Sequence, residues 1–500
     1  MSLQKHETKY VKDTIKRKLT KTELQIVAAE WSEHCSYKSS KKHLKMLPTT
    51  GPNVILEKGY DSGVLDVGDS YVVTVHIESH NHPSAVEPFG GAATGVGGVI
   101  RDILSTGTRP IAILDGLRFG NIENDAHARW LFKNAVSGIA DYGNCLGIPT
   151  IGGEVEFDDC YKNYALVNVA AIGYGKKDRL IKNHANKGDL VVLIGGPTGR
   201  DGIGGSQFAS NSLESEDRSA VQIPDPFIEK LIIETILEAR NEKCINAMKD
   251  LGGGGLSCAI SETAESLGIG IELDVDRVHT RESGLSPDEI MISESQERMM
   301  FTVKPEDVDR VLARSKAWDV EAVPIGKVIT EKRNIVRFNG VEILNLDLEF
   351  TTGGPVYNRP YNLPDYDTGP AAPLPEYPAD LGKTILDLVS QPEVASKDWV
   401  IRQYDHEVRG KTALKPIQGP IGKDVPGDSS VLKPVDDSWK GLALTTDVNP
   451  YLMEANPYHG TRSAVEEVCR NLAAVGARID SLADCLCFGN PRKPDIMGQF

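Results

Sequence analysis

The chain has 500 residues, a formal net charge of −16 and 40% apolar residues, a length that suggests roughly three or four domains. Its acidic balance argues against electrostatic binding to nucleic acid or to an anionic membrane, because both need a basic face. The N-terminus lacks the apolar segment of a signal peptide, and no run approaches the ~18 apolar residues of a membrane span. Eight scattered cysteines in such a chain predict reduced thiols and a cytoplasmic location.

Helices and strands are predicted to alternate through the first 350 residues, which favours an α/β or α+β fold. Thr20 and Glu23 form a capping box at the start of a helical segment within 20–47, and the polar run after Trp31 ends its apolar pattern. Further helices are expected at 92–106, 127–142 and 226–243. Strands are expected at 71–77, 111–114, 166–172, 188–196, 270–275, 299–303 and 335–346.

These elements fall into successive segments. We expect an N-terminal extension over 1–19, a first domain over 20–180 and a second domain over 181–350. A proline-rich stretch with few apolar runs predicts a linker over 351–394. A third domain is expected over 395–500.

Part of the sequence is repeated at an offset of 369 positions. This alignment places Gly91 on Gly460 and Arg101 on Arg470, and it superimposes the D-x-L-x-F-G-N motif of 115–121 on that of 484–490. A repeat this long indicates a duplicated domain and not a solenoid. A second copy as long as the first would end near about residue 720, so we expect either a fragment or a natural short form.

Residues 76–102 combine histidines, acids and a glycine-rich run, a mixture that a fold alone does not need. Glu78, His80 and His82 occupy alternate positions, so a continuing strand would place them on one face. Such a set could bind zinc, or supply a magnesium carboxylate and a general base. Asp102 and Asp250 also adjoin glycine-rich loops, which favours Mg²⁺ with nucleotide phosphates over zinc.

Three further motifs contain reactive side chains. The polar density of Ser32–Ser39 (SEHCSYKS) favours a functional role for His34. Cys145 lies in a G-x-C-x-G pattern like the elbow of glutamine amidotransferases, but that elbow needs a strand before it and a helix after it, the reverse of the prediction here. We therefore interpret Cys145 as a structural thiol. Cys485-x-Cys487 lacks the second pair that a zinc site would need.

Taken together, SEHCSYKSS, ESHNHPSAVEP, GAATGVGGVIRD, TGRDGIGG, DLGGGGLS and ESQERM resemble the multi-subunit phosphoribosylformylglycinamidine synthases, from about residue 20 onward. That family belongs to the aminoimidazole ribonucleotide synthetase-like superfamily, which implies paired N- and C-terminal α/β domains, duplicated in this enzyme. The resemblance implies ATP-dependent amidation of formylglycinamide ribonucleotide through an iminophosphate, in purine biosynthesis. It also implies ATP and Mg²⁺ as cofactors, and a glutaminase subunit and a small bridging subunit as partners.

The resemblance also implies roles for individual residues. His34 matches the family's active-site histidine and His80 its proton acceptor, while Glu78 would bind one magnesium ion and Asp102 with Asp250 another. Nucleotide contacts would come from Tyr37, His76 and Asp484. Substrate contacts would come from Ser79, His80, Asn81, His82, Arg101, Gln222, Glu294, Ser295 and Gln296. The family usually has Lys or Arg at position 76, and its second-half G-G-N-x-S motif does not occur within these 500 residues.

Two other interpretations were compared with this one. Selenophosphate or thiamine-phosphate kinase types of the same superfamily lack the pair SEHCSYKSS and ESHNHPS. A non-catalytic scaffold conflicts with the intact acids and histidines of the first copy. In the second copy, however, His80 falls on Asn449 and His82 on Tyr451, which leaves either a structural nucleotide site or no site there.

Overall fold

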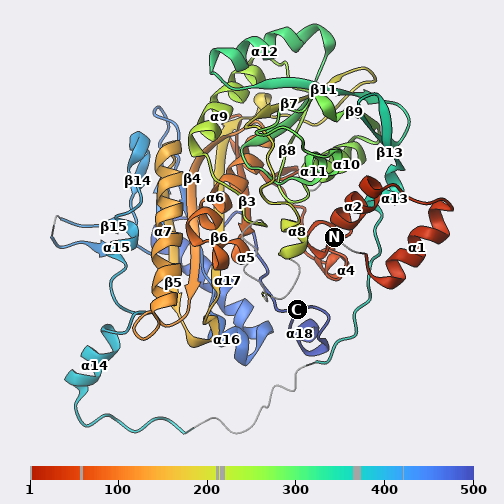
Figure 1. Cartoon of the computed structure of the whole chain (residues 1–500). Coiled ribbons are helices and arrows are strands. Elements are labelled where there is room, and N and C mark those ends of the chain that lie inside the picture. The colour runs from red at the N-terminus through yellow and green to blue at the C-terminus, as the bar shows by residue number, and fades with distance from the viewer. Residues whose placement is uncertain (1–2, 57–59, 210–212, 214–219, 364–372, 421) are drawn as a thin grey trace.

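The computed structural model describes residues 3–56, 60–209, 213, 220–363, 373–420 and 422–500. Two large mixed sheets, each flanked by helices, form its centre (Figure 1). The predicted α/β class is confirmed. Within the described part of the chain, no helix has both the length and the apolar character needed to cross a bilayer.

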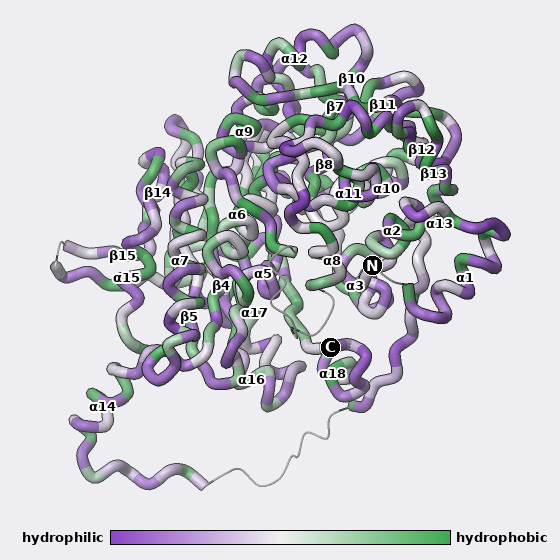
Figure 2. Tube along the Cα trace, viewed as in Figure 1, coloured by the Kyte–Doolittle hydropathy of each residue, from purple (hydrophilic) through white to green (hydrophobic). Residues whose placement is uncertain are grey.

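The first sheet has the strand order β1-β2-β3-β6-β4-β5, and only the β4–β5 pair is parallel. Its strands are β1 (Val54–Leu56), β2 (Gly63–Gly68), β3 (Tyr71–Ser79), β4 (Arg109–Phe119), β5 (Thr150–Phe157) and β6 (Ala165–Lys176). Helices α6 (Pro88–Ser105) and α7 (Ala126–Leu146) pack on it; α7 begins at the side-chain cap of Asp125 and ends at Gly147, whose φ of +63° suits glycine. In Figure 2, α6 lies in the hydrophobic interior.

The second sheet has the order β13-β12-β9-β11-β7-β10-β8. Its strands are β7 (Leu190–Gly195), β8 (Ala247–Asp250), β9 (Gly270–Asp274), β10 (Arg298–Val303), β11 (Ala322–Ile329), β12 (Arg333–Phe338) and β13 (Val341–Asp347). Its helices are α8 (Gly205–Phe208), α9 (Pro226–Asn241), α10 (Gly255–Leu267), α11 (Pro287–Ile292), α12 (Val308–Ala317) and α13 (Leu348–Thr352). One core cluster contains residues of α6, α7 and α9, so it fixes the two sheets relative to each other.

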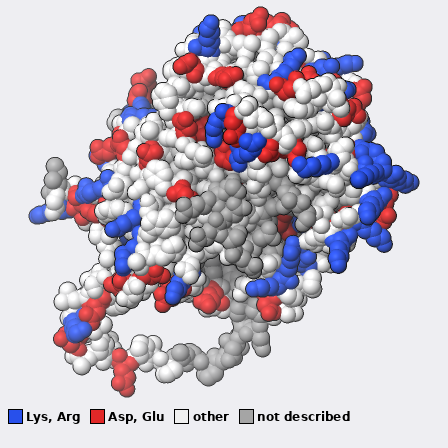
Figure 3. All heavy atoms as spheres, in the orientation of Figure 1, with Lys and Arg blue, Asp and Glu red and all other residues white. Residues whose placement is uncertain are grey.

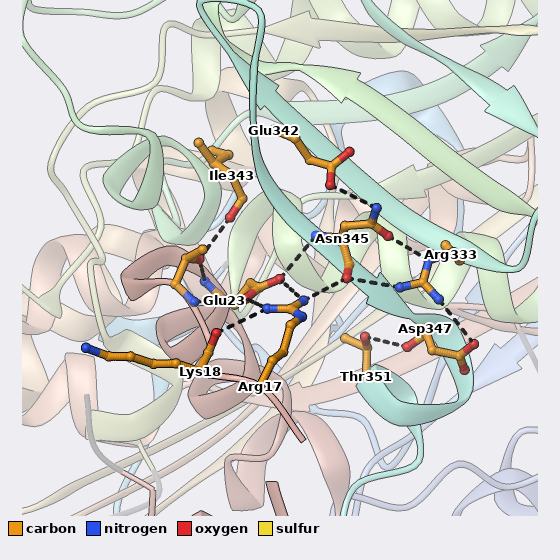
Figure 4. A network of polar contacts seen from close by, with 10 residues as sticks. Arg17, Lys18, Glu23, Arg333, Glu342, Ile343, Asn345, Asp347 and Thr351 are labelled. Carbon is orange, nitrogen blue, oxygen red and sulfur yellow. Dashed lines mark hydrogen bonds and ion pairs between the residues drawn. The ribbon is translucent and has the colours of Figure 1, made fainter. Parts of the chain in front are cut away.

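The N-terminal segment forms four short helices: α1 (Lys5–Ile15), α2 (Lys21–Glu30), α3 (Glu33–Ser36) and α4 (Lys41–Leu44). The predicted capping box is present, since Thr20 and Glu23 exchange hydrogen bonds. The Glu23 carboxylate also accepts from Arg17 at 2.7 Å and from the backbone N–H of Asn345 at 3.2 Å, which anchors α2 to β13 (Figure 4). Exposed lysines of α1 give the molecule a basic edge despite its acidic total (Figure 3).

The repeat predicted from the sequence recurs in the structure. Helices α5 (Asn81–Val86) and α6 correspond residue for residue, at the offset of 369, to α16 (Pro450–Ala455) and α17 (Pro457–Ala474). A Cβ on Gly91 would approach the Ser84 nitrogen to 2.5 Å, and a Cβ on Gly460 would approach the Met453 nitrogen to the same 2.5 Å. Both glycines therefore permit the same close helix contact, as expected of a duplicated domain.

The second copy packs on the sheet of the first. Its three-stranded sheet has the order β14 (Thr412–Leu414), β17 (Ser430–Leu432) and β18 (Leu442–Leu444). Leu432, Leu442 and Leu444 of this small sheet join a cluster with residues of β3, β4, β5 and β6. The remaining elements are β15 (Ile417–Gln418), β16 (Val425–Pro426), α14 (Leu381–Val389), α15 (Asp398–Ile401) and α18 (Pro494–Gln499).

Candidate functional site

The end of β3 differs from the sequence prediction. The strand stops at Ser79, and His80 precedes helix α5, so Glu78, His80 and His82 do not line one strand face. The Asn81 side chain explains the ending: its Oδ1 accepts from the Val167 N–H at 2.8 Å, a donor that a continuing strand would have paired with backbone. Pro83 lies in the first turn of α5, where a missing N–H costs nothing.

His80 is nevertheless directed into the site. Its Nδ1 lies 2.5 Å from the Gly91 carbonyl oxygen, so Nδ1 carries the proton and donates, and Nε2 is the acceptor. A Cβ on Gly95 would lie 2.9 Å from the His80 Cβ, so the glycines of α6 allow the imidazole to lie against the helix. Burial lowers the pKa of His80 to about 4, which keeps the ring neutral at pH 7.

His82, in contrast, is held by aromatic residues. Its Nδ1 lies 3.1 Å from the Tyr164 hydroxyl, and its ring makes edge contacts with Tyr164 and Phe208. His82 therefore lies between the first sheet and α8.

Two groups of acidic and imidazole ligands meet at Asp102. One group comprises His76, Glu78 and Asp102, the other Asp61, Asp102 and Asp250, and in each the candidate ligand atoms lie within 4.8 Å of one another. The His76 Nε2 is 3.0 Å from Asp102 and 3.4 Å from Glu78. The sequence prediction separated Glu78 from Asp102 and Asp250, whereas the structure makes Asp102 common to both groups.

The pKa values in these groups diverge. Desolvation and the nearby Asp250 carboxylate raise the pKa of Asp102, and desolvation raises that of Asp250 to about 6. Glu78 behaves in the opposite way: although desolvation works against it, the hydrogen bond and charge of His76 lower its pKa to about 2. The buried carboxylates of Asp102 and Asp250 repel each other at this separation, and a bound cation would relieve that repulsion.

The second sheet contributes the other side of the site. Asp250 ends β8, and the glycine loop after it contacts the imidazole of His34, which would lie 2.9 Å from a Cβ on Gly253. His34 is carried by α3, which begins at the side-chain cap of Ser32. The Glu294 carboxylate accepts from the N–H groups of Ser206 and Gly254, both at 2.9 Å, and so ties two glycine-rich loops together.

Most predicted substrate residues of the second sheet are buried and already hydrogen-bonded. Arg101 donates to Gln296 at 2.5 Å, Gln222 donates to Glu294 at 3.0 Å, and Ser295 donates to Asp201 at 2.8 Å. The Arg101–Gln296 contact joins α6, which packs on the first sheet, to the segment that leads into β10 of the second sheet. Ser79, by comparison, is exposed at the rim.

The two predicted nucleotide contacts outside β3 lie at the opening. Tyr37 ends α3 with a φ of +50° and is 55% exposed; desolvation at this crowded rim and the charge of Glu78 raise its pKa to about 12. Asp484 is exposed, and its neighbour Cys485 lies beside Ser79 and Asn168. The repeat therefore brings its D-x-L-x-F-G-N segment to the site of the first copy.

Family models agree with this architecture. The model described as AIR synthase related protein, N-terminal domain, matches residues 59–174 and 426–500, and the corresponding C-terminal domain matches 186–339. The formylglycinamide ribonucleotide amidotransferase linker domain matches residues 1–38.

Curated relatives extend the match to the whole chain. Phosphoribosylformylglycinamidine synthase subunit PurL of Thermococcus sibiricus is 48% identical over 500 residues, a match that covers 99% of this chain and 68% of that protein. Subunit PurL of Pyrococcus abyssi is 47% identical with the same coverage. The chain belongs to the PurL family.

Solved PurL structures have the same fold. The structure of Thermotoga maritima PurL complexed with FGAR has a TM-score of 0.83 at 33% identity and covers 99% of this chain and 76% of its own. The same protein complexed with ATP gives a TM-score of 0.81 at 32% identity. Membership of the PurL family confirms the predicted resemblance and makes this chain part of a ligase of purine biosynthesis.

The sequence prediction missed two charged residues of the site. Lys249, next to Asp250, pairs with Asp61 and with Glu262, the latter at 2.6 Å, and it lies 3.8 Å from Asp250. Asp61 belongs to no motif, so only the approach of the two sheets reveals it as a candidate ligand. For Lys249, the one indication in the sequence was its position next to Asp250, a predicted metal ligand.

Proposed function

We propose that this chain converts formylglycinamide ribonucleotide to the amidine at the junction of the two sheets, using ATP and ammonia. The observation that carries the proposal is the convergence on Asp102 of two ligand groups, one formed by the first sheet and its helix alone and one that includes Asp250 of the second sheet, beside a neutral His80. The loop after Asp250 lies next to these groups, where its backbone N–H groups could donate to phosphate oxygens. The glycine-rich run before Asp102 is not the loop that the sequence predicted but the buried helix α6, whose N–H groups bond within the helix.

The residues present fit magnesium. Carboxylate oxygens are the ligands that Mg²⁺ prefers, and Asp61, Asp102 and Asp250 offer them within 4.8 Å of one another. Glu78 and His76 extend the set, since the His76 Nε2 lies 3.0 Å from Asp102 and 3.4 Å from Glu78. When bound, magnesium would supply the positive charge that holds and neutralises the nucleotide phosphates.

In the proposed reaction, the substrate's glycinamide carbonyl oxygen takes the terminal phosphoryl group of ATP, and ADP leaves. Ammonia then forms a bond to the carbonyl carbon, and the bond from that carbon to the phosphorylated oxygen breaks to release phosphate. His80 is the proposed proton acceptor, because Nδ1–H is fixed on Gly91 and leaves Nε2 for the reacting group. His34, whose imidazole lies against Gly253, is the proposed second active-site histidine, on the other side of the site from His80.

We propose that ammonia comes from a separate glutaminase subunit, joined through a small bridging subunit, in the cytoplasm. Cys145 is unsuited to glutaminase chemistry because it lies at the end of helix α7 with strand β5 after it, the order that the elbow motif excludes. Desolvation and the charge of Asp141 also raise the pKa of Cys145, which disfavours its thiolate. The purified chain should therefore release no glutamate from glutamine, and such release would contradict a separate glutaminase.

The site is tested by calorimetric titration of the chain with Mg-ATP. The Asp250→Asn variant should bind at least tenfold more weakly, a loss of about 1.4 kcal/mol or more. Asp309→Asn changes an exposed acid of helix α12 in the same way and should keep the affinity of the unmodified chain. Equal Mg-ATP affinities for the two variants would show that Asp250 does not contribute to Mg-ATP binding.

A further inference from the structure

The segment 484–487 carries a pair of thiols to the rim of the site. At the offset of 369, Cys487 replaces Arg118, which in the first copy is buried and pairs with Glu154 at 2.8 Å and Glu156 at 3.1 Å. Likewise, Cys485 replaces Gly116. The second copy therefore has two sulfur atoms where the first has an internal ion pair and a glycine.

Both thiols converge on one side chain of the first sheet. The Cys487 Sγ lies 3.4 Å from the Asn168 Oδ1, and the Cys485 Sγ lies 4.0 Å from the same atom. Asn168 pairs with Ser79 in the β3–β6 ladder. The Asn81 Nδ2 donates to the Cys487 Sγ at 3.6 Å, so the two thiols contact Asn81 of the ESHNHPS motif and Asn168, the ladder partner of Ser79.

The spacing of the two cysteines allows them to react with each other. Residues two apart span at most about 7 Å between Cα atoms, close to the range of roughly 4.4–6.8 Å found in disulfides. Both Sγ atoms lie within 4.0 Å of the same Asn168 Oδ1. A covalent bond between them would therefore need only a local adjustment of the segment.

The surroundings make one of these sulfur atoms a nucleophile. Hydrogen bonds from Cys485 and Asn81 lower the pKa of Cys487 to about 6, while the shared hydrogen bond and desolvation raise the pKa of Cys485. Cys160 is exposed too, but desolvation and Asp158 raise its pKa to about 12. Exposed thiolates are the cysteines that react with peroxides.

We propose that Cys485 and Cys487 form an oxidisable dithiol site, and that closing it to a disulfide weakens substrate binding at the Ser79–Asn81 edge. The oxidant is a hydroperoxide. The Cys487 thiolate attacks hydrogen peroxide, an S–O bond forms, the O–O bond breaks and hydroxide leaves. The Cys485 sulfur then attacks the sulfenic acid, the S–S bond forms, and the S–O bond breaks to release water with the proton of Cys485.

Closure would withdraw the Cys487 sulfur from the Asn81 amide. The Asn81 Oδ1 also accepts a hydrogen bond from the Val167 N–H at the end of the β3–β6 ladder. The Asn81 side chain is therefore held both by Cys487 at the rim and by β6 of the sheet. Loss of the sulfur acceptor would free that amide and disturb the edge that presents Ser79. The effect on substrate binding rests on the proposed function, whereas formation of the disulfide does not.

Peptide mapping after limited hydrogen peroxide treatment of the full chain tests the dithiol site. We expect the peptide containing Cys485 and Cys487 to lose two hydrogen atoms and to regain them with dithiothreitol. Cys485→Ser should stop at a sulfenic acid that dimedone traps, Cys487→Ser should react at least tenfold more slowly, and Cys160→Ser should leave the rate unchanged. Oxidation spread evenly over the exposed cysteines, or the absence of a disulfide within this peptide, would overturn the proposed dithiol site.

A binding experiment tests the coupling to substrate. Formylglycinamide ribonucleotide should bind the oxidised chain at least tenfold more weakly than the reduced chain, and the Cys485→Ser and Cys487→Ser variants should keep their affinity after the same treatment. Unchanged affinity in a chain shown to carry the disulfide would overturn the coupling. Failure of the reduced chain to bind the substrate would instead count against the proposed function, and the peptide map would still decide the dithiol site.

Discussion

Lys38 donates to the carboxylate of Glu7 at 2.8 Å, and both side chains are buried. The same ammonium also donates to the Trp31 carbonyl, and the Tyr357 hydroxyl donates to Glu7 at 2.8 Å. This ion pair thus fastens helix α1 and the segment after α13 to the end of helix α3, which bears His34 and Tyr37. Lys38, which follows Tyr37 in the SEHCSYKSS motif, therefore positions this end of the site, a role that the sequence pattern did not indicate.

Replacing Lys38 with methionine should destabilise the chain by about 3–5 kcal/mol, because it leaves the Glu7 carboxylate buried without its cation. Urea unfolding measures this change. Lys41→Met, an exposed position on α4, serves as the control. The double variant Lys38→Met with Glu7→Gln should recover part of the loss, and a double variant no more stable than Lys38→Met would show that the ion pair is not the cause.

The His80→Ala variant of a substrate-competent enzyme should lose roughly 10²–10⁴-fold in kcat while it stays folded, as expected for removal of a general base. Because burial holds the pKa of His80 near about 4, the ring is neutral from pH 6 to 8, and the loss should be similar across that range. His127→Ala changes an exposed residue at the start of α7 and is the control. Equal turnover by the two variants at matched stability would leave His34 as the next candidate.

Glu30 makes folding stability depend on pH. Desolvation inside the α2–α10 contact raises its pKa from 4.5 to about 8. Between these two pKa values the folded state holds a proton that the unfolded state has lost. The contribution of protonated Glu30 to the free energy of unfolding is therefore complete below pH 4.5 and is lost as the pH rises through about 8. Glu30→Gln should therefore raise the melting temperature at pH 9 and change it little at pH 5, and an equal effect at both pH values would contradict a buried, protonated Glu30.

Gly91→Ala and Gly460→Ala should each destabilise the chain by about 1–3 kcal/mol, because the added methyl group would meet backbone atoms at 2.5 Å. Similar losses are expected because the helix pairs are equivalent. Gly51→Ala, whose Cβ would make an ordinary 3.5 Å contact, is the matched control. A loss in Gly91→Ala without one in Gly460→Ala, measured by chemical unfolding, would show that the second copy packs more loosely than its geometry indicates.

Local and repeated features were predictable from the sequence. The capping box at Thr20, the long helices α6, α7 and α9, and the register of the repeat depend on nearby residues or on self-comparison. The end of β3 was mispredicted because alternation continued through His82 while the Asn81 side chain took over the strand's hydrogen bond. Asp61 and Lys249 were missed because they reach the site only when two sheets meet, and the domain boundaries at 180 and 350 stay predictions.

The rim of the site joins residues that lie far apart in the chain: Asn81 and Cys487 are separated by 406 positions. A ribosome adding about 5–20 residues per second would need roughly 20–80 s to synthesise the intervening chain. During that interval the first two sheets can fold around Arg101 and Glu294, but the edge at Ser79 remains without its neighbour. The nascent chain would therefore complete the junction of its two large sheets well before it completes the rim of the site.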